Sequence, residues 1–108
     1  MKVKELAVKL NLTPISVADE DREIKGGYAG DLLSWVMGRA QAGDVWVTIM
    51  SNVNIVAVAT LADVSAVVLA EGVALEEDVK ETAQTRGVNV YSSPEDSFWL
   101  CGKIAEML

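Results

Sequence analysis

The stretch GDVWVTIMSNVNIVAVATLADVSAVVLAEG, residues 43–72, predicts the centre of the fold. It contains two β-rich runs without a charge, Val45–Met50 and Ala66–Ala70, separated by a segment that is also largely apolar. Continuous apolar strands are typical of a parallel sheet covered on both faces, because neither side of such a strand meets water. We therefore interpret the stretch as a strand, a helix and a strand that together form one βαβ unit.

The segment between the two runs has two interpretations. It is a strand at residues 55–59 if residues 51–54 form a hairpin turn. It is a helix from Val53 to Ala62 if Ser51 or Asn52 supplies the N-cap oxygen, and its several alanines favour that state. We predict the buried helix, with Val45–Ile49 and Ala66–Leu69 as parallel neighbours, and the hairpin stays the alternative.

The length, hydrophobic fraction and net charge of the chain exclude several classes of protein. The 108 residues correspond to one domain, residues 1–108, with a hydrophobic fraction of 51% that suggests a subunit interface and hence a homodimer. The net charge is −7 and histidine is absent, so the surface should repel phosphate backbones and anionic lipid head groups. We expect neither a nucleic-acid nor a membrane partner, and no cofactor or metal.

The chain shows no sign of export. Met1-Lys2-Val3-Lys4-Glu5 is too charged to begin a signal peptide, and no uncharged apolar run reaches the roughly 20 residues that span a bilayer. Cys101 is the only cysteine, which excludes an internal disulfide. A cytoplasmic location is therefore the expectation.

Strands and helices should alternate along the rest of the chain. The predicted elements are a helix at 2–10, a strand at 15–18, a charged connection at 19–23, a strand that begins at 24 and dissolves into glycines by 30, a helix at 32–40, a helix that ends at 86–87, a strand at 88–91 and a last helix to 108. Asp31 is expected to cap the helix at 32–40, and Leu32, Leu33, Val36, Met37 and Ala40 to form its core face. Ser93 is expected to cap the last helix, with Pro94 at its first position. The fold class is thus α/β, a layered sandwich with a mostly parallel sheet of about five strands flanked by helices.

Three motifs together resemble a DRTGG domain. They are Asp21-Arg22 followed by Gly26-Gly27, then GDLLSWVM at 30–37, and GDVWVTI at 43–49 leading into NIVAVA at 54–59. The likeness covers nearly the whole chain. The letters that name the family are not contiguous, because Glu23-Ile24-Lys25 separates the arginine from the glycines, so no role is carried over to the threonine of that name.

The resemblance implies a fold similar to the N-terminal domain of HPr kinase/phosphorylase and of the Mur ligases. DRTGG domains also accompany nucleotide-sensing CBS pairs in some pyrophosphatases, where the domain looks regulatory or architectural. No catalytic residues are established for such domains, so the resemblance supplies none. It implies a regulatory domain rather than an enzyme.

A small anionic ligand, such as a nucleotide, is the first functional hypothesis. In parallel α/β sheets ligands bind outside the carboxyl ends of the strands, where backbone N–H groups of helix N-termini point. The candidate ligand-binding residues are Arg22, Gly26, Gly27, Gly30, Ser51, Asn52 and Asn54. We expect the glycine loop 26–30 to meet Ser51-Asn52 there, with Arg22 adding a charge-assisted bond. The alternative is that the glycines make turns, the Ser and Asn residues cap helices, and Arg22 pairs with Asp19, Glu20 or Asp21.

The second hypothesis is a structural module that docks on a larger enzyme through apolar helix faces, without a small ligand. The last helix carries more apolar positions than one core face needs, so Trp99, Leu100 or Met107 can lie at a subunit interface. Trp46 belongs in the core. An enzyme is the weakest option, because the chain has no histidine to activate a serine or Cys101, and Cys101 fits the apolar pattern of a packed thiol.

Overall fold

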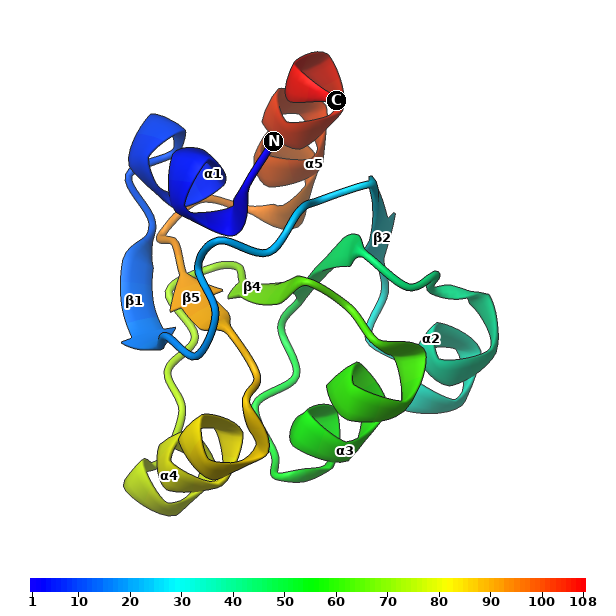
Figure 1. Ribbon diagram of the computed structural model, residues 1–108, viewed down its shortest axis with the longest axis vertical. Helices are drawn as coiled ribbons and strands as arrows, with labels where there is room; N and C mark the ends of the chain where they lie inside the picture. Colours follow the sequence, from blue (N-terminus) through cyan, green and yellow to red (C-terminus); the bar gives the residue numbers. More distant parts are fainter.

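The computed structural model describes residues 1–108 and contains five strands and five helices that alternate along most of the chain (Figure 1). The elements are α1 (Val3–Lys9), β1 (Thr13–Ser16), β2 (Gly26–Ala29), α2 (Leu33–Arg39), β3 (Asp44–Thr48), α3 (Asn54–Ala62), β4 (Ala66–Leu69), α4 (Glu77–Arg86), β5 (Val90–Ser92) and α5 (Ser97–Met107). The strands form one sheet in the order β1-β5-β4-β3-β2. Only β1 is antiparallel to its neighbour, so the predicted mostly parallel α/β class is confirmed.

The central βαβ unit is the one that the sequence predicts. Strands β3 and β4 are parallel neighbours, with Val45 opposite Ala66 and Thr48 opposite Leu69. Residues 55–59 lie in helix α3, which excludes the hairpin alternative. Every residue of both strands is buried. The uncharged runs thus correspond to strands that meet helices on both faces.

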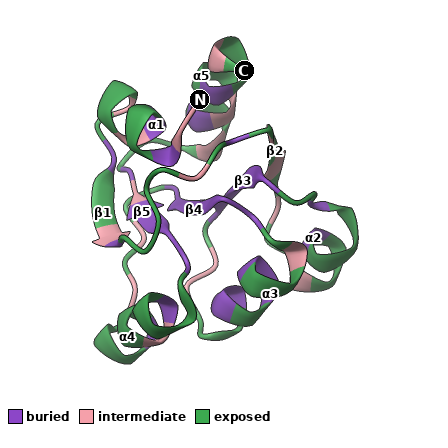
Figure 2. Cartoon of the chain, viewed as in Figure 1, coloured by how far each residue is buried: buried purple, intermediate pink, exposed green.

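Helices cover the two faces of the sheet in unequal numbers. Helices α1 and α5 lie on one side, and α2, α3 and α4 lie on the other (Figure 1). Side chains alternate along β3, so Val45 and Val47 join the core under α1 and α5, whereas Trp46 joins the core under α2, α3 and α4. Purple buried segments concentrate in the middle strands, and green exposed surface covers the outer sides of the helices (Figure 2).

The glycine segment is a strand and not a loop, which corrects the prediction. Strand β2 consists of Gly26, Gly27, Tyr28 and Ala29, and it is in register with Asp44–Val47 of β3. Strand formation here does not come from β propensity, which is low for glycine. The strand forms because its parallel neighbour, β3, offers backbone hydrogen-bond partners along its length. Just before the strand, the Lys25 N–H donates to the Gly43 carbonyl and so starts the pairing.

Two predicted helix caps are wrong, and both residues bond elsewhere. Asp31 does not cap α2; its Oδ1 accepts from Thr48 Oγ1 at 2.7 Å and from the Ile49 N–H at 2.9 Å. Helix α5 begins at Ser97, with Asp96 as its N-cap accepting from the Trp99 N–H at 2.7 Å. Ser93 instead accepts from the Glu95 N–H, in a turn that precedes the helix. The Asp31 carboxylate thus bonds to the end of β3, and Ser93 bonds to a turn because α5 begins at Ser97.

The predicted core face of α2 is also too wide. Val36 and Ala40 are buried and Leu33 packs against the core, but Leu32 and Met37 are exposed. Helix α2 is short and lies at one end of its layer, so it presents only a narrow stripe to the sheet. None of the helices is both long and apolar enough to cross a membrane.

Candidate functional site

The structure distributes the predicted ligand-binding residues over opposite ends of the sheet. Gly30 follows β2, and Ser51, Asn52 and Asn54 follow β3, so these four lie at the carboxyl end. Gly26 opposes Asp44, the first residue of β3, and therefore lies at the amino end. The expectation that Gly26 and Ser51 meet in one cradle is wrong.

Arg22 also lies at the amino end, where it holds the end of helix α3. Its Nη2 donates to the carbonyl oxygen and to Oδ1 of Asp63, both at 2.7 Å. Asp63 adopts a left-handed conformation, with φ 59°, as the C-cap of α3. Arg22 is therefore paired as the alternative interpretation expected, although its partner is Asp63 and not a neighbouring acid. This pair ties the 19–25 segment to α3.

The N–H groups at the start of α3 already have partners. The Asn54 N–H donates to Asn52 Oδ1 at 2.9 Å, and the Ile55 N–H donates to the Asn52 carbonyl at 3.1 Å. Both acceptors belong to Asn52, which precedes the helix, so these N–H groups lack intrahelical partners but are not free for an anion. Asn52, one residue before the N-cap Val53, thus leaves fewer donors for an anion.

At the amino end of the sheet, position 26 has no room for a side chain beside Asp44. A Cβ at this position would lie 2.8 Å from Asp44 Oδ1, whereas a Cβ at Gly27 would meet nothing closer than 3.6 Å. The other carboxylate oxygen of Asp44 accepts from the Gln41 N–H at 2.8 Å, which restrains the side chain. The absence of a side chain at Gly26 therefore leaves room for the Asp44 carboxylate.

We expect Gly26→Ala to lower the free energy of unfolding by about 1–3 kcal/mol, because the new methyl group overlaps a held carboxylate. Gly27→Ala is the matched control and should change it by less than about 0.5 kcal/mol. Urea denaturation of both variants measures the difference. Equal effects would show that Asp44 moves aside without cost.

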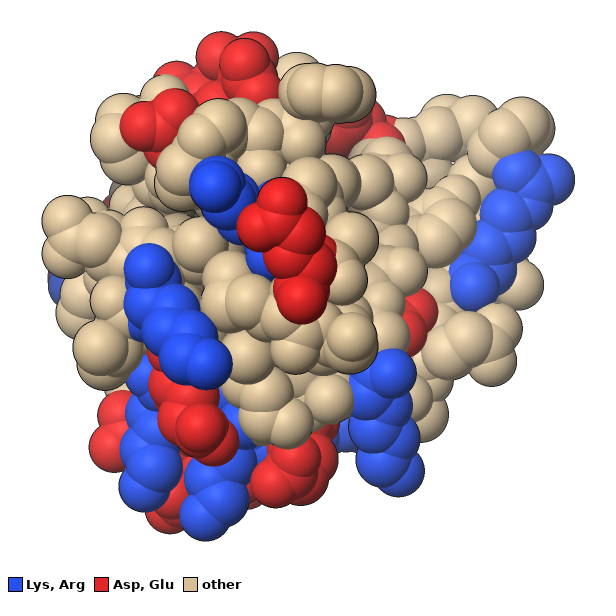
Figure 3. Space-filling model, turned by 90° about the horizontal axis from the view of Figure 1, so that it is seen from above, with Lys and Arg blue, Asp and Glu red and all other residues tan.

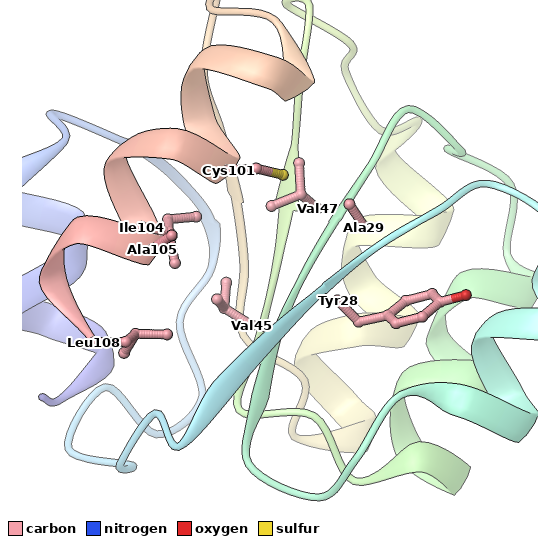
Figure 4. Close-up of a pocket in the computed structure, with 9 residues that line it drawn as sticks. Tyr28, Ala29, Val45, Val47, Cys101, Ile104, Ala105 and Leu108 are labelled. Atoms are coloured by element: carbon pink, nitrogen blue, oxygen red, sulfur yellow. The ribbon is translucent and has the colours of Figure 1, made fainter.

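A hollow of about 290 Å³ opens on the face of the sheet beside α5 (Figure 4). We call it the α5–β2 groove, and it is lined by Gly27, Tyr28, Ala29, Val45, Val47, Cys101, Ile104, Ala105 and Leu108. In Figure 4 the Tyr28 ring extends away from α5, whereas Cys101 and Leu108 extend from α5 toward β2 and β3. Gly27 and Ala29 are level with Val45 and Val47. Because these edge positions carry at most a methyl group, α5 covers the sheet incompletely there.

No charged side chain lines the α5–β2 groove, and its only reactive group is the thiol of Cys101. Burial raises the pKa of that thiol above its ordinary value. A raised pKa lowers the thiolate fraction, and the thiolate is the nucleophile. No group of three or more acidic or sulfur side chains could hold a metal ion. The groove is suited to binding an apolar surface.

The Cys101 thiol should ionise at a higher pH in the folded chain than in the unfolded chain. The rate of alkylation by iodoacetamide follows the thiolate fraction, so the midpoint of its pH profile should move upward in the native protein. The same measurement in guanidinium chloride provides the reference. A native midpoint at or below the unfolded one would contradict the assigned effect of burial.

The family model described as "DRTGG domain" matches residues 29–107, which is most of the chain. The chain belongs to the DRTGG domain family. The match includes the segments 30–37 and 43–59 that carry the resemblance, and it excludes Arg22, Gly26 and Gly27. The glycines after the arginine are thus not what identifies this chain.

One solved structure shares the fold over nearly the whole chain. It is the regulatory region of a Clostridium perfringens pyrophosphatase, containing CBS and DRTGG domains and complexed with its activator, diadenosine tetraphosphate. The TM-score is 0.79 at 16% sequence identity, over 99% of this chain and 47% of that chain. This chain therefore spans about half the length of that one. A comparison with curated proteins finds no match.

Proposed function

We propose that this chain is a non-enzymatic regulatory domain that acts by binding a protein surface at the α5–β2 groove. The observation that carries the proposal is the groove itself, an uncharged hollow at the open edge of the sheet. Apolar surface that is open to water favours association, because covering it removes that surface from solvent. The two candidate partners are a second copy of the chain and a larger enzyme.

The solved relative supports the regulatory part of this proposal. In that protein a DRTGG domain belongs to the regulatory region of an enzyme. The present chain matches only 47% of it, so the remainder of that region has no counterpart in these residues. A regulatory domain acts through a surface that contacts what it regulates, and the groove is such a surface.

Site-specific photo-crosslinking tests the proposal, because it captures a bound partner of any identity. Phe98 is 90% exposed and lies one helical turn before Cys101, on the side of α5 that borders the groove. A benzophenone analogue of phenylalanine at position 98 should form adducts with a specific protein in cells. The matched control carries the analogue in place of Leu61, which is 71% exposed on α3. Adducts that are absent, or equal from both positions, would refute the proposal.

A small anionic ligand at the carboxyl end is the second candidate function. It is favoured by the position of Gly30, Ser51, Asn52 and Asn54 at one end of the sheet, and by the nucleotide named for the solved relative. A panel of mono- and dinucleotides in a thermal-shift assay tests it. A saturable rise in melting temperature that persists in Arg22→Ala and disappears in Asn52→Ala would support this site. No shift with any nucleotide would leave protein association as the function.

A further inference from the structure

We infer that the end of the sheet from which α2, α3, α4 and α5 start is a second binding surface, and that its partner is a basic amphipathic segment of another protein. This carboxyl-end surface consists of the connections that follow β2, β3, β4 and β5, with the first three residues of the next helix: residues 30–35, 49–56, 70–79 and 93–99. The four strands are parallel, so the four segments share one end of the sheet. The inference goes beyond the proposed function, because the α5–β2 groove lies on a face of the sheet and not at the strand ends.

The whole net charge of the chain lies in the carboxyl-end surface. Its segments contain no lysine or arginine and seven acidic residues, Asp31, Glu71, Glu76, Glu77, Asp78, Glu95 and Asp96. The chain has 16 acidic and 9 basic residues, so the remainder of the chain is neutral and the net charge of −7 belongs to this end. The four helix N-termini supply roughly half a positive charge each, which offsets less than half of it.

The acids of this surface have no counter-charge within the chain. Every ion pair of the structure takes its cation from residues 1–22 and its acid from outside the surface. The backbones of Glu71 and Glu95 are in contact, since the Glu71 N–H donates to the Glu95 carbonyl at 2.8 Å, and no cation is paired with either side chain. At the top of Figure 3 acidic side chains lie among uncharged ones, whereas acidic and basic side chains lie together at the lower left. Like charges held together repel, so this end favours a cationic partner and opposes an anionic one.

The same surface exposes apolar side chains. Six of the 11 exposed large apolar side chains of the chain lie in these segments, which hold under a third of its residues. They are Leu32, Trp35, Ile49, Val53, Phe98 and Trp99. Apolar side chains among charges of one sign match a segment that carries apolar residues beside Lys or Arg, whose aliphatic stems also cover apolar surface. The charge and the apolar side chains thus specify the same kind of partner.

Titration with synthetic peptides tests the inference. The probe is a fluorescent helical peptide of about 18 residues, built from Leu and Lys at amphipathic spacing. Fluorescence anisotropy should show saturable binding of the probe to the wild-type chain, and no binding of the same peptide with Glu in place of Lys. Glu71→Lys combined with Glu95→Lys should weaken binding of the probe by more than about 10-fold. The matched control, Glu81→Lys combined with Glu106→Lys, changes the net charge equally at exposed positions outside the surface, so it should stay within about 2-fold of the wild type.

A second pair of variants measures the apolar contribution. Leu32 and Val53 are the N-caps of α2 and α3, a position that serine favours, so Leu32→Ser combined with Val53→Ser should retain the fold. This pair should weaken binding of the probe by about 5-fold, because less apolar surface is covered. Leu61→Ser, at a 71% exposed position of α3, is the matched control and should bind as the wild type does. Circular dichroism of every variant verifies that the fold is retained.

Three results would overturn the inference: no binding of the basic probe, equal weakening by the two charge-reversed pairs, or binding of the acidic probe. A nucleotide that binds in place of the basic probe, and binds more tightly after Glu71→Lys with Glu95→Lys, would show that this end is an anion site. The proposed function is tested separately. Adducts from position 98 that persist in the Glu71→Lys and Glu95→Lys background belong to the α5–β2 groove, whatever the peptides do.

Discussion

Replacing Trp46 with alanine should lower the free energy of unfolding by about 3–5 kcal/mol, the range measured for large aromatic side chains in cores. Trp46 is the largest fully buried side chain of the protein, at 0% exposure in the middle of β3. Its indole Nε1 donates to the Gly30 carbonyl at 2.9 Å, which links β3 to the residue after β2. The substitution therefore removes core volume and leaves that carbonyl without its donor.

Urea denaturation with tryptophan-independent detection measures the effect, because two tryptophans remain. Trp35→Ala is the matched control. Trp35 is 53% exposed on α2, and its ring is stacked under the Arg39 guanidinium at 3.6 Å. Losing an exposed cation–π pair should cost about 0.5–1 kcal/mol. If both variants lose the same free energy, burial in β3 does not determine the stability of the sheet.

The centre of the fold could be predicted because its strands are uniformly apolar. Val45–Ile49 and Ala66–Leu69 carry no polar face, and such runs have few stable arrangements other than a covered parallel sheet. The linking helix followed from its alanines, although its N-cap is Val53 and not Ser51 or Asn52; the Asn52 side chain accepts from the Asn54 N–H from one residue further back. Local propensity and tertiary burial favour the same structure at these positions, so the sequence was sufficient.

The sequence predicted a strand that begins near residue 24, but not that it continues through the glycines of β2, because the stability of that part is not local. Glycine disfavours strands, and Gly26-Gly27 suggested a flexible phosphate-binding loop. The structure forms the strand through pairing with β3, which places Gly26 at the amino end of the sheet and Gly30 at the carboxyl end. The assumption that neighbouring glycines share one site fails for this reason, and with it the predicted cradle.

The α5–β2 groove also depends on the pairing of β2 with β3. Gly27 and Ala29 are ordinary small residues in the sequence, and they become the floor of a hollow only when their register with Val45 and Val47 is known. From its excess of apolar positions the sequence predicted an interface on the last helix, which stays a prediction, and the structure buries one of the candidates, Leu100, in the chain's own core. What it could not indicate was that the unpaired side of that helix borders the open edge of the sheet. This depends on topology and not on composition.

Asn89→Ala should lower the free energy of unfolding by about 2–4 kcal/mol, because it leaves several backbone groups without a partner. The Asn89 side chain is buried between β4, β5 and the 17–22 segment. Its Oδ1 accepts from the N–H groups of Ala18 and Asp19, at 2.8 and 2.9 Å. Its Nδ2 donates to the Asp19 carbonyl at 2.7 Å and to the buried Ser65 carbonyl at 2.9 Å. One amide thus satisfies four backbone groups from two distant segments.

Asn89→Asp separates the two halves of this network. It keeps the acceptor for Ala18 and Asp19, but it puts a carboxylate oxygen opposite two carbonyl oxygens, so it should destabilise at least as much as Asn89→Ala at pH 7. Asn52→Ala is the matched control, because its single exposed bond to the Asn54 N–H should be worth only about 0.5–1 kcal/mol. Hydrogen exchange should show faster exchange of the Ala18 and Asp19 amides in both Asn89 variants and unchanged exchange in Asn52→Ala. If those amides stay protected in Asn89→Ala, the 17–22 segment is held by the Arg22–Asp63 pair and not by Asn89.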